Sequence, residues 1–216
     1  MPDYTYDENT ETLTLNPSIT TLEPLKEFLK WRDSIVNVRF DKGDWCGKDE
    51  IIKEILQAVC CGNIALKSCE LPDRLTKIGS DAFEHCTSLK SIIIPKTVTE
   101  IGDCAFWGCD SLKSITLPDS VTEIGWEAFF GCESLTKITF CGEVESIGNV
   151  IFDKCPKLQK IEVCSKGMEE KMRECVKSAK NVRIKVVSQK DGQNGCPLRT
   201  LLDFGRVLHI GRNKGR

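Results

Sequence analysis

The stretches IPKTVTEIGDCAFWGCDSLKSIT (residues 94–116) and LPDSVTEIGWEAFFGCESLTKIT (residues 117–139) repeat one pattern at a spacing of 23 residues. Two further copies begin at Leu71 and Phe140. The four copies align in columns of identical residue types, which are Ile78, Ile101, Ile124 and Ile147; Phe83, Phe106, Phe129 and Phe152; Cys86, Cys109, Cys132 and Cys155; and Leu89, Leu112, Leu135 and Leu158. A fixed period of this length predicts a solenoid in which each copy forms one coil.

Each segment of a copy has its own structural expectation. Residues 89–94 and their copies are rich in β-branched residues and predict a short strand before a turn. Residues 81–86 are too few for an independent helix and predict one helical turn. The glycine after each column isoleucine, such as Gly102, predicts a positive φ. Apolar side chains at eight positions of each copy are expected to point inward, and in one copy these are Val98, Ile101, Ala105, Phe106, Cys109, Leu112, Ile115 and Leu117.

The run from Leu117 to Leu135, LPDSVTEIGWEAFFGCESL, resembles the leucine-rich repeat of the BspA-like, or Treponema pallidum-type, family. The resemblance covers about residues 70–163. It implies an α/β fold, a right-handed solenoid with a parallel sheet on the concave face and short helices and turns on the convex face. It also implies an interaction role, often at a microbial surface. It transfers no catalytic residue, because the repeat motif is structural.

The flanking segments extend the same register in altered form. We expect one solenoid over 1–187, with degenerate repeats and a cap over 1–70, regular repeats over 71–163 and a C-terminal cap over 164–187. In the first segment we expect strands at Thr12–Leu15 and Ser34–Phe40 and helices at Leu22–Trp31 and Lys48–Cys60. In the last we expect a helix at Gly167–Ala179 and a strand at Val182–Val187. Residues 188–216 form a basic tail.

Composition and charge argue against nucleic-acid-binding and membrane-spanning classes of protein. The chain is 40% apolar and 29% charged, which is ordinary for a folded domain. A net charge of −2 gives no reason to expect nucleic-acid binding. No apolar run is long enough for a membrane span. The acidic first residues lack an apolar signal core, so the chain as given is predicted to be cytoplasmic. An N-terminally truncated chain would instead leave a cell-surface or secreted location open.

The chain contains thirteen cysteines and two histidines, and their positions bear on metal sites, catalytic groups and disulfides. The four column cysteines are interpreted as small apolar core residues. No ligand spacing predicts a metal, and no motif predicts a cofactor or a catalytic group, so no enzymatic activity is expected. The 23-residue spacing of Cys141 and Cys164 allows a disulfide between them. Free thiols otherwise favour a reducing compartment.

Three aromatic residues occupy columns in which the other copies have polar residues, and they are candidate partner-binding residues. Trp107 and Phe130 share a column, so their rings are expected side by side on the outer face. Trp126 lies in another column that is predicted to be exposed. Clustered surface aromatics are typical of a contact surface, for a partner or for self-association. The alternative is that the rings fold back over their own coil.

Three cations form the second candidate partner-binding set. Lys137, Lys160 and Arg183 precede the strand isoleucine in successive copies and are expected to project together from one end of the concave face. Like charges on adjacent strands repel one another, so an acidic partner segment lying along them would explain their presence. The alternative is a solvated row that serves solubility.

Together these features predict a non-catalytic protein-binding module, and the family resemblance implies the adhesion or host-interaction type. The alternative function is an intracellular scaffold for a protein partner, which the absence of a signal sequence and the unpaired thiols favour.

Overall fold

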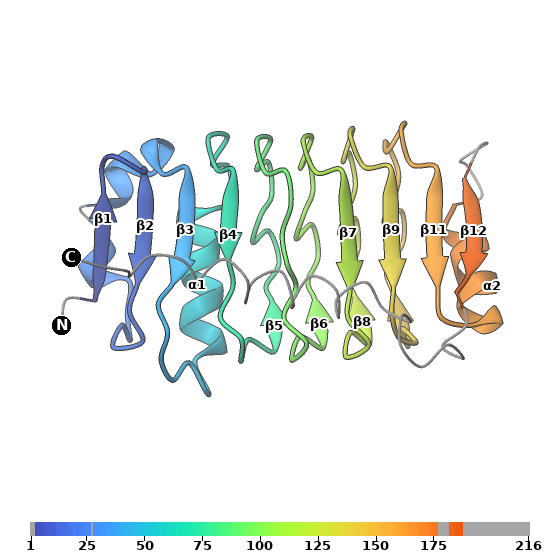
Figure 1. Cartoon of the computed structure of the whole chain (residues 1–216), viewed down its shortest axis with the longest axis horizontal. Coiled ribbons are helices and arrows are strands. Elements are labelled where there is room, and N and C mark those ends of the chain that lie inside the picture. The colour runs from blue at the N-terminus through green and yellow to red at the C-terminus, as the bar shows by residue number, and fades with distance from the viewer. Residues whose placement is uncertain (1–2, 27, 177–181, 188–216) are drawn as a thin grey trace, which may run out of the picture.

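The computed structural model describes residues 3–26, 28–176 and 182–187, and it shows coils stacked along one axis (Figure 1). One side carries two four-stranded sheets. The first has the order β1-β2-β3-β4, and the second has the order β12-β11-β9-β7. Their strands are β1 (Tyr4–Asp7), β2 (Thr12–Leu15), β3 (Asn37–Phe40), β4 (Ser68–Glu70), β7 (Ser114–Leu117), β9 (Lys137–Phe140), β11 (Lys160–Val163) and β12 (Arg183–Val186). All pairs are parallel except the hairpin β1–β2, which the sequence pattern did not reveal.

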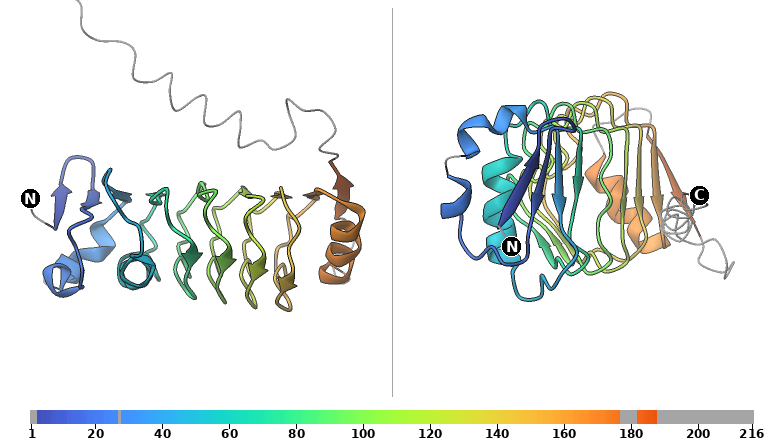
Figure 2. Two further views of the ribbon diagram at one scale, coloured as in Figure 1. Left: turned by 90° about the horizontal axis from the view of Figure 1, so that it is seen from below. Right: turned by 60° about the vertical axis from the view of Figure 1, so that its left-hand side comes forward.

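A second row of two-residue strands lies on another side of the coils, with helices at both of its ends (Figure 2). The row contains β5 (Lys77–Ile78), β6 (Glu100–Ile101), β8 (Glu123–Ile124) and β10 (Ser146–Ile147). Helix α1 (Asp49–Val59) lies beyond β5, and helix α2 (Lys166–Cys175) lies beyond β10. The leucine-rich-repeat fold, with parallel sheets and short helices or turns, is thereby confirmed.

One copy lacks the predicted strand. Residues 91–94 form no strand, and the two sheets of the first row therefore end on either side of them. Pro72, Pro95 and Pro118 occupy one column next to this break, and proline has no N–H to donate to a ladder. In the next copy Cys141 replaces proline, and its N–H donates to the Leu117 carbonyl at 3.0 Å. The prolines thus remove a backbone hydrogen bond between coils that the later coils have.

The core consists of stacked columns. Phe83, Phe106 and Phe129 are fully buried, and their ring centroids lie 5.3 and 5.4 Å apart, nearly parallel. All eight positions predicted to be buried in residues 98–117 are indeed buried. Each large apolar side chain contributes about 1.5–3 kcal/mol on burial, and each needs neighbouring coils to bury it.

The glycines that follow the column isoleucines have a role other than the predicted one. Gly102, Gly125 and Gly148 do not have a positive φ. They allow close approach of coils instead, because a Cβ on Gly125 would lie 2.4 Å from the Asp103 nitrogen. Positive φ values occur in two other columns, which contain Asp81, Cys104, Glu127 and Val150, and His85, Gly108, Gly131 and Lys154.

The segments between these two columns are hydrogen-bonded turns and not the predicted helical turn. Glu84 donates its N–H to the Asp81 carbonyl at 3.1 Å, and the same bond recurs in the next copies. Backbone bonds also join each turn to the following one, as when Phe106 donates to Ala128 at 2.8 Å. The turns are therefore held mainly by their neighbours in the stack.

The cysteine column packs in the core as predicted and also satisfies backbone carbonyls. The thiol of Cys109 donates to the Phe83 carbonyl at 3.1 Å, and Cys132 and Cys155 make the same contact one and two coils later. The disulfide that the register allowed between Cys141 and Cys164 is wrong. Cys164 is a free thiol whose Sγ lies 3.7 Å from Glu143 Oε1.

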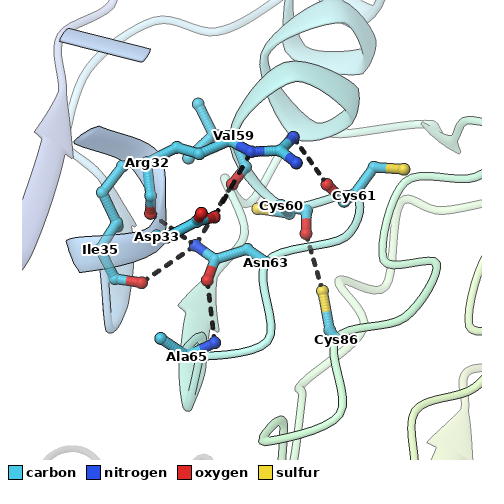
Figure 3. Close-up of polar contacts among 9 residues, drawn as sticks. All are labelled: Arg32, Asp33, Ile35, Val59, Cys60, Cys61, Asn63, Ala65 and Cys86. Atoms are coloured by element: carbon cyan, nitrogen blue, oxygen red, sulfur yellow. Dashed lines mark hydrogen bonds and ion pairs between the residues drawn. The ribbon is translucent and has the colours of Figure 1, made fainter. Parts of the chain in front are cut away.

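Asn63 occupies the position one repeat before Cys86 and joins the N-terminal segment to the first coil (Figure 3). It is fully buried, and its amide nitrogen donates to the carbonyls of Arg32 and Ile35, both at 3.0 Å, and of Val59 at 3.4 Å. Its Oδ1 accepts from the Ala65 N–H at 3.0 Å. One side chain thereby ties the end of a 3₁₀ helix to α1.

The terminal segments follow the predicted pattern with local differences. The strand at Thr12–Leu15 is confirmed, and the helix predicted at Lys48–Cys60 is present as α1. The strand predicted at Ser34–Phe40 is shorter and covers Asn37–Phe40, because Ser34 ends a 3₁₀ helix. The helix predicted at Leu22–Trp31 is wrong, because two 3₁₀ helices, η1 (Glu23–Leu25) and η2 (Phe28–Ser34), replace it. The i+3 bond from Leu25 N–H to the Leu22 carbonyl is characteristic of this geometry. The tail over 188–216 lies outside the described residues, so the predicted domain limits stay predictions.

Candidate functional site

The structure brings Trp107 and Phe130 together in what we call the aromatic row. Their ring centroids are 6.0 Å apart on adjacent turns, and both side chains are half-buried. The row continues in both directions. The His85 ring lies 4.4 Å from Trp107, and the Lys154 ammonium lies 5.1 Å from the centroid of Phe130.

His85 and Lys154 were missed as members of the row because they belong to the neighbouring sequence column. Both have a positive φ, 54° and 56°. This backbone conformation marks where each turn bends back, and the sequence predicted it for another column. A cation near an aromatic face adds about 0.5–1 kcal/mol at an exposed site. The row is therefore a continuous apolar strip with a cation at one end.

Trp126 lies apart from the aromatic row. The residue is 64% exposed, and its backbone N–H donates to Asp103 Oδ1 at 2.7 Å. It borders a groove of about 280 Å³ on the face of the β5-β6-β8-β10 row. This groove is lined by the close-approach glycines and by carboxylates, including Gly102, Gly125, Gly148, Glu100, Glu123 and Asp103. Trp126 is thus exposed as predicted but belongs to a different surface.

The three cations, which we call the cation row, occupy neighbouring register positions on β9, β11 and β12. Lys137 and Lys160 each place Nζ 2.7 Å from a carboxylate oxygen of Glu162, whose side chain is only 12% exposed. Thr139 also donates to Glu162, at 3.2 Å. The expectation of three mutually repelling cations is therefore wrong, because Glu162 on β11 lies between two of them and neutralises much of their charge.

Glu162 is held as an anion by these neighbours. Partial burial alone would raise the pKa of its carboxyl group, but hydrogen bonds from Lys137 and Lys160 and their charges outweigh burial and lower it to about 2. Arg183 and Lys185 on β12 are exposed, and neither forms an ion pair with another described residue. The unneutralised positive charge of this face therefore lies at its last strand.

Among the described residues, several cysteines have raised pKa values and no metal-binding cluster is found. Burial raises the pKa of the Cys86 and Cys109 thiols well above the usual range, and this disfavours the reactive thiolate. Burial and the nearby Glu84 raise the pKa of Cys61 to about 11. Across 3–26, 28–176 and 182–187, no group of three or more His, Cys, Asp or Glu residues could hold a metal ion. Over the same residues no helix is long and apolar enough to cross a membrane.

Comparison with known structures gives bacterial leucine-rich repeat proteins. A Treponema pallidum leucine-rich repeat protein is 22% identical, with a TM-score of 0.49, and the match covers 80% of this chain and 92% of that one. A Bacteroides ovatus leucine-rich repeat protein is 31% identical, with a TM-score of 0.41, and covers 60% of this chain. A leucine-rich cell surface protein of Faecalibacterium prausnitzii is 22% identical, with a TM-score of 0.39 and 60% coverage. This chain spans only 29% and 40% of the last two proteins. No curated protein matches significantly.

The family comparison is direct. The model of the BspA type leucine rich repeat region matches residues 53–180 with six copies, which is more than half of the 216 residues. This range includes all four regular copies, together with α2 and most of α1. The chain therefore belongs to the family of BspA-type leucine-rich repeat proteins.

Proposed function

We propose that this chain is a non-catalytic protein-binding module of the adhesion or host-interaction type, and that the aromatic row is the centre of its contact surface. The observation that supports this most is the location of the rings. The core already contains one buried phenylalanine per coil, so Trp107 and Phe130 are additional large apolar residues at the surface. Surface aromatics with a polar rim are typical of binding energy concentrated in a few residues.

The cation row has a narrower role in this proposal. Because Glu162 holds Lys137 and Lys160, an acidic partner segment would meet free positive charge mainly at Arg183 and Lys185. Charges at the edge of an interface affect association rate and salt dependence more than affinity. We propose that the β12 end of this face guides an acidic segment of the partner protein.

The first test replaces the aromatic row. Trp107→Glu with Phe130→Glu is expected to abolish capture of the partner in a pull-down with the intact chain and to weaken any self-association seen by sedimentation. Ser91→Glu with Ser114→Glu is the matched control, since it adds the same two charges at exposed positions of one repeat column, Ser114 on β7 and Ser91 in the segment without a strand. Equal capture by the parent and the aromatic variant, with equal unfolding midpoints, would remove the row from the function.

The second test addresses the cations. Reversal of Lys137 and Lys160 would place carboxylates beside Glu162 and destabilise the fold, so it cannot isolate binding. Arg183→Glu with Lys185→Glu is the cleaner pair, and it is expected to slow association and flatten its salt dependence. Lys90→Glu with Lys113→Glu reverses two exposed cations elsewhere. If both pairs act equally, net charge and not this face controls binding.

The second candidate function, an intracellular scaffold, is favoured by the free thiols. Cys60, Cys69, Cys86, Cys109 and Cys132 are all buried as free thiols. The buried thiols resist oxidation in either setting, so the test measures the exposed Cys46 in protein isolated from its native source. An oxidised Cys46 indicates an exported protein, and a reduced Cys46 indicates a reducing compartment.

A further inference from the structure

The stack of turns ends at an edge with unsatisfied backbone donors. In the regular coils Cys104, Phe106 and Gly108 donate their N–H groups to the following turn, at 2.8, 2.8 and 2.9 Å. The equivalent residues of the last turn are Val150, Phe152 and Lys154. Among the residues that the structure describes, nothing accepts from these three N–H groups. Three donors, each two residues from the next, therefore lie at the last turn of the stack.

An acceptor ends unpaired at the same edge. In each earlier coil the column isoleucine accepts from the glycine of the next coil, as Ile124 does from Gly148 at 2.8 Å. Ile147 is the last member of this column, and no described N–H reaches its carbonyl. The edge thus presents both backbone donors and a backbone acceptor, which is the property that lets an exposed edge pair with an added strand.

The opposite edge of the row is partly capped. Asp49 of α1 accepts from the N–H and the hydroxyl of Thr76, at 2.9 and 2.6 Å. Gly62 donates to the Glu84 carbonyl at 2.6 Å. Helix α1 also packs so closely that a Cβ on Gly79 would lie 2.5 Å from Lys53 Cγ. Helix α1 and Gly62, which follows it, therefore make direct hydrogen bonds to the first coil.

Helix α2 does not close its edge in the same way. A groove of about 620 Å³ separates it from the last coil, with Glu145, Ile147, Val150 and Asp153 on one side and Lys171, Glu174 and Cys175 on the other. Lys171 donates to the Val144 carbonyl at 2.6 Å, so its ammonium group is already engaged. Acidic side chains outnumber basic ones along the groove.

Val150 adds exposed apolar surface at this edge. It is 42% exposed and has a φ of 51°, a conformation that β-branched residues rarely adopt. Asp81, Cys104 and Glu127 have a positive φ at the equivalent position, so the repeated turn sets this conformation. At Val150 the turn lies at the groove and exposes an apolar side chain.

We propose that this edge binds an extended segment of another polypeptide by strand addition, with Lys or Arg side chains of that segment facing Glu145 and Asp153. The segment would accept from the N–H groups of the last turn, donate to Ile147 and cover Val150. A second copy of this chain fits less well, because edge-to-edge pairing would bring these carboxylates against each other. This site is distinct from the aromatic row.

The test measures hydrogen exchange by NMR on the full chain with a defined probe, the acetylated and amidated peptide Lys-Val-Lys-Val-Lys-Val-Lys. Saturation with the peptide is expected to slow exchange of the Val150, Phe152 and Lys154 amides at least 10-fold and to leave the Cys104 amide unchanged. The same peptide with Glu in place of Lys, and one with alternate Pro residues, are controls that lack the charge and the donors.

A charge variant supplies the independent check. Glu145→Gln with Asp153→Asn is expected to weaken peptide binding at least 10-fold without changing the unfolding midpoint. Asp119→Asn with Glu123→Gln is the matched control, because it removes two exposed carboxylates outside the groove. Unchanged exchange at saturating peptide, or equal binding by both variants, would overturn the proposal. Protection of the amides without peptide would also overturn it. Such protection indicates this chain's own residues if it is independent of protein concentration, and a second copy if it is not.

Discussion

At the scale of single residues, similar side chains only one position apart have different environments. Phe129 lies in the buried column, 5.4 Å from Phe106, whereas Phe130 lies half-buried in the aromatic row. The alternation follows from the turn, which directs one side chain into the stack and the next one outward. Residue type alone does not distinguish them, but the 23-residue register does.

This difference predicts unequal losses of stability. Phe129→Ala is expected to lower the free energy of unfolding by about 3–5 kcal/mol, because it leaves a void that two coils share. Phe130→Ala is expected to lower it by about 1 kcal/mol, since that ring loses only partial burial. Urea unfolding of the two variants measures both values. Equal losses would contradict the register on which every inward and outward assignment depends.

Glu162 makes stability depend on pH in a defined direction. Its pKa is lowered from 4.5 to about 2, so its contribution is complete above pH 4.5 and disappears as the pH falls toward 2. At pH 7, Glu162→Gln is expected to lose about 1–3 kcal/mol. The gap to the parent is expected to narrow between pH 4.5 and 2, measured by urea unfolding. The exposed Glu133→Gln is the control, and a gap that stays constant with pH would contradict the pairing with both lysines.

At the scale of elements, much of the fold was predictable and the exceptions have specific physical causes. The strand and turn order, α1 and the buried columns follow from periodicity, because a recurring apolar residue must reach a shared core. The loss of the strand at 91–94 depends on prolines in three successive coils, an effect that no single copy reveals. The pairing of Lys137 and Lys160 with Glu162 depends on side-chain reach across strands, which a column pattern does not contain. The open edge beyond β10 depends on the placement of α2, which sequence left unspecified.

The glycine columns allow the two roles of glycine to be separated by experiment. Gly125→Ala is expected to lower the free energy of unfolding by at least about 2 kcal/mol, because the added Cβ would lie 2.4 Å from the Asp103 backbone nitrogen. Gly131→Ala is expected to cost about 1 kcal/mol, since its φ is 70° but its nearest neighbour would lie 3.8 Å away. His85 and Lys154 already occupy the Gly131 column. Thermal or urea unfolding of the pair measures the difference, and a larger loss at Gly131 would reverse the two roles.

At the scale of the whole molecule, the break at 91–94 divides the first row of strands but not the core. The phenylalanine column and the β5-β6-β8-β10 row both continue across it. A repeat protein whose neighbouring coils share their core unfolds cooperatively when the interfaces are strong. The continuous column therefore favours one cooperative unit over two.

Native-state hydrogen exchange tests this directly. The amides of Val38 on β3 and Ile138 on β9 lie on opposite sides of the break and are expected to exchange with the same free energy of opening, within about 1 kcal/mol. A larger difference would show that the two sheets open separately. The amide of the exposed Lys154 is the fast-exchanging reference.

The stacked phenylalanines also relate the number of repeat copies to the length of the solenoid. Each copy of 23 residues advances the column by one ring, and the copies over 94–116 and 117–139 stack directly on each other through the same columns. An additional copy inserted between them would lengthen the rod by roughly 5 Å and leave both end structures intact. Repeat number would then set the distance between α1 and the open edge beyond β10. A copy inserted at this point would also separate Trp107 from Phe130, so the aromatic row would stay continuous only if the added turn carried an aromatic residue in the same column.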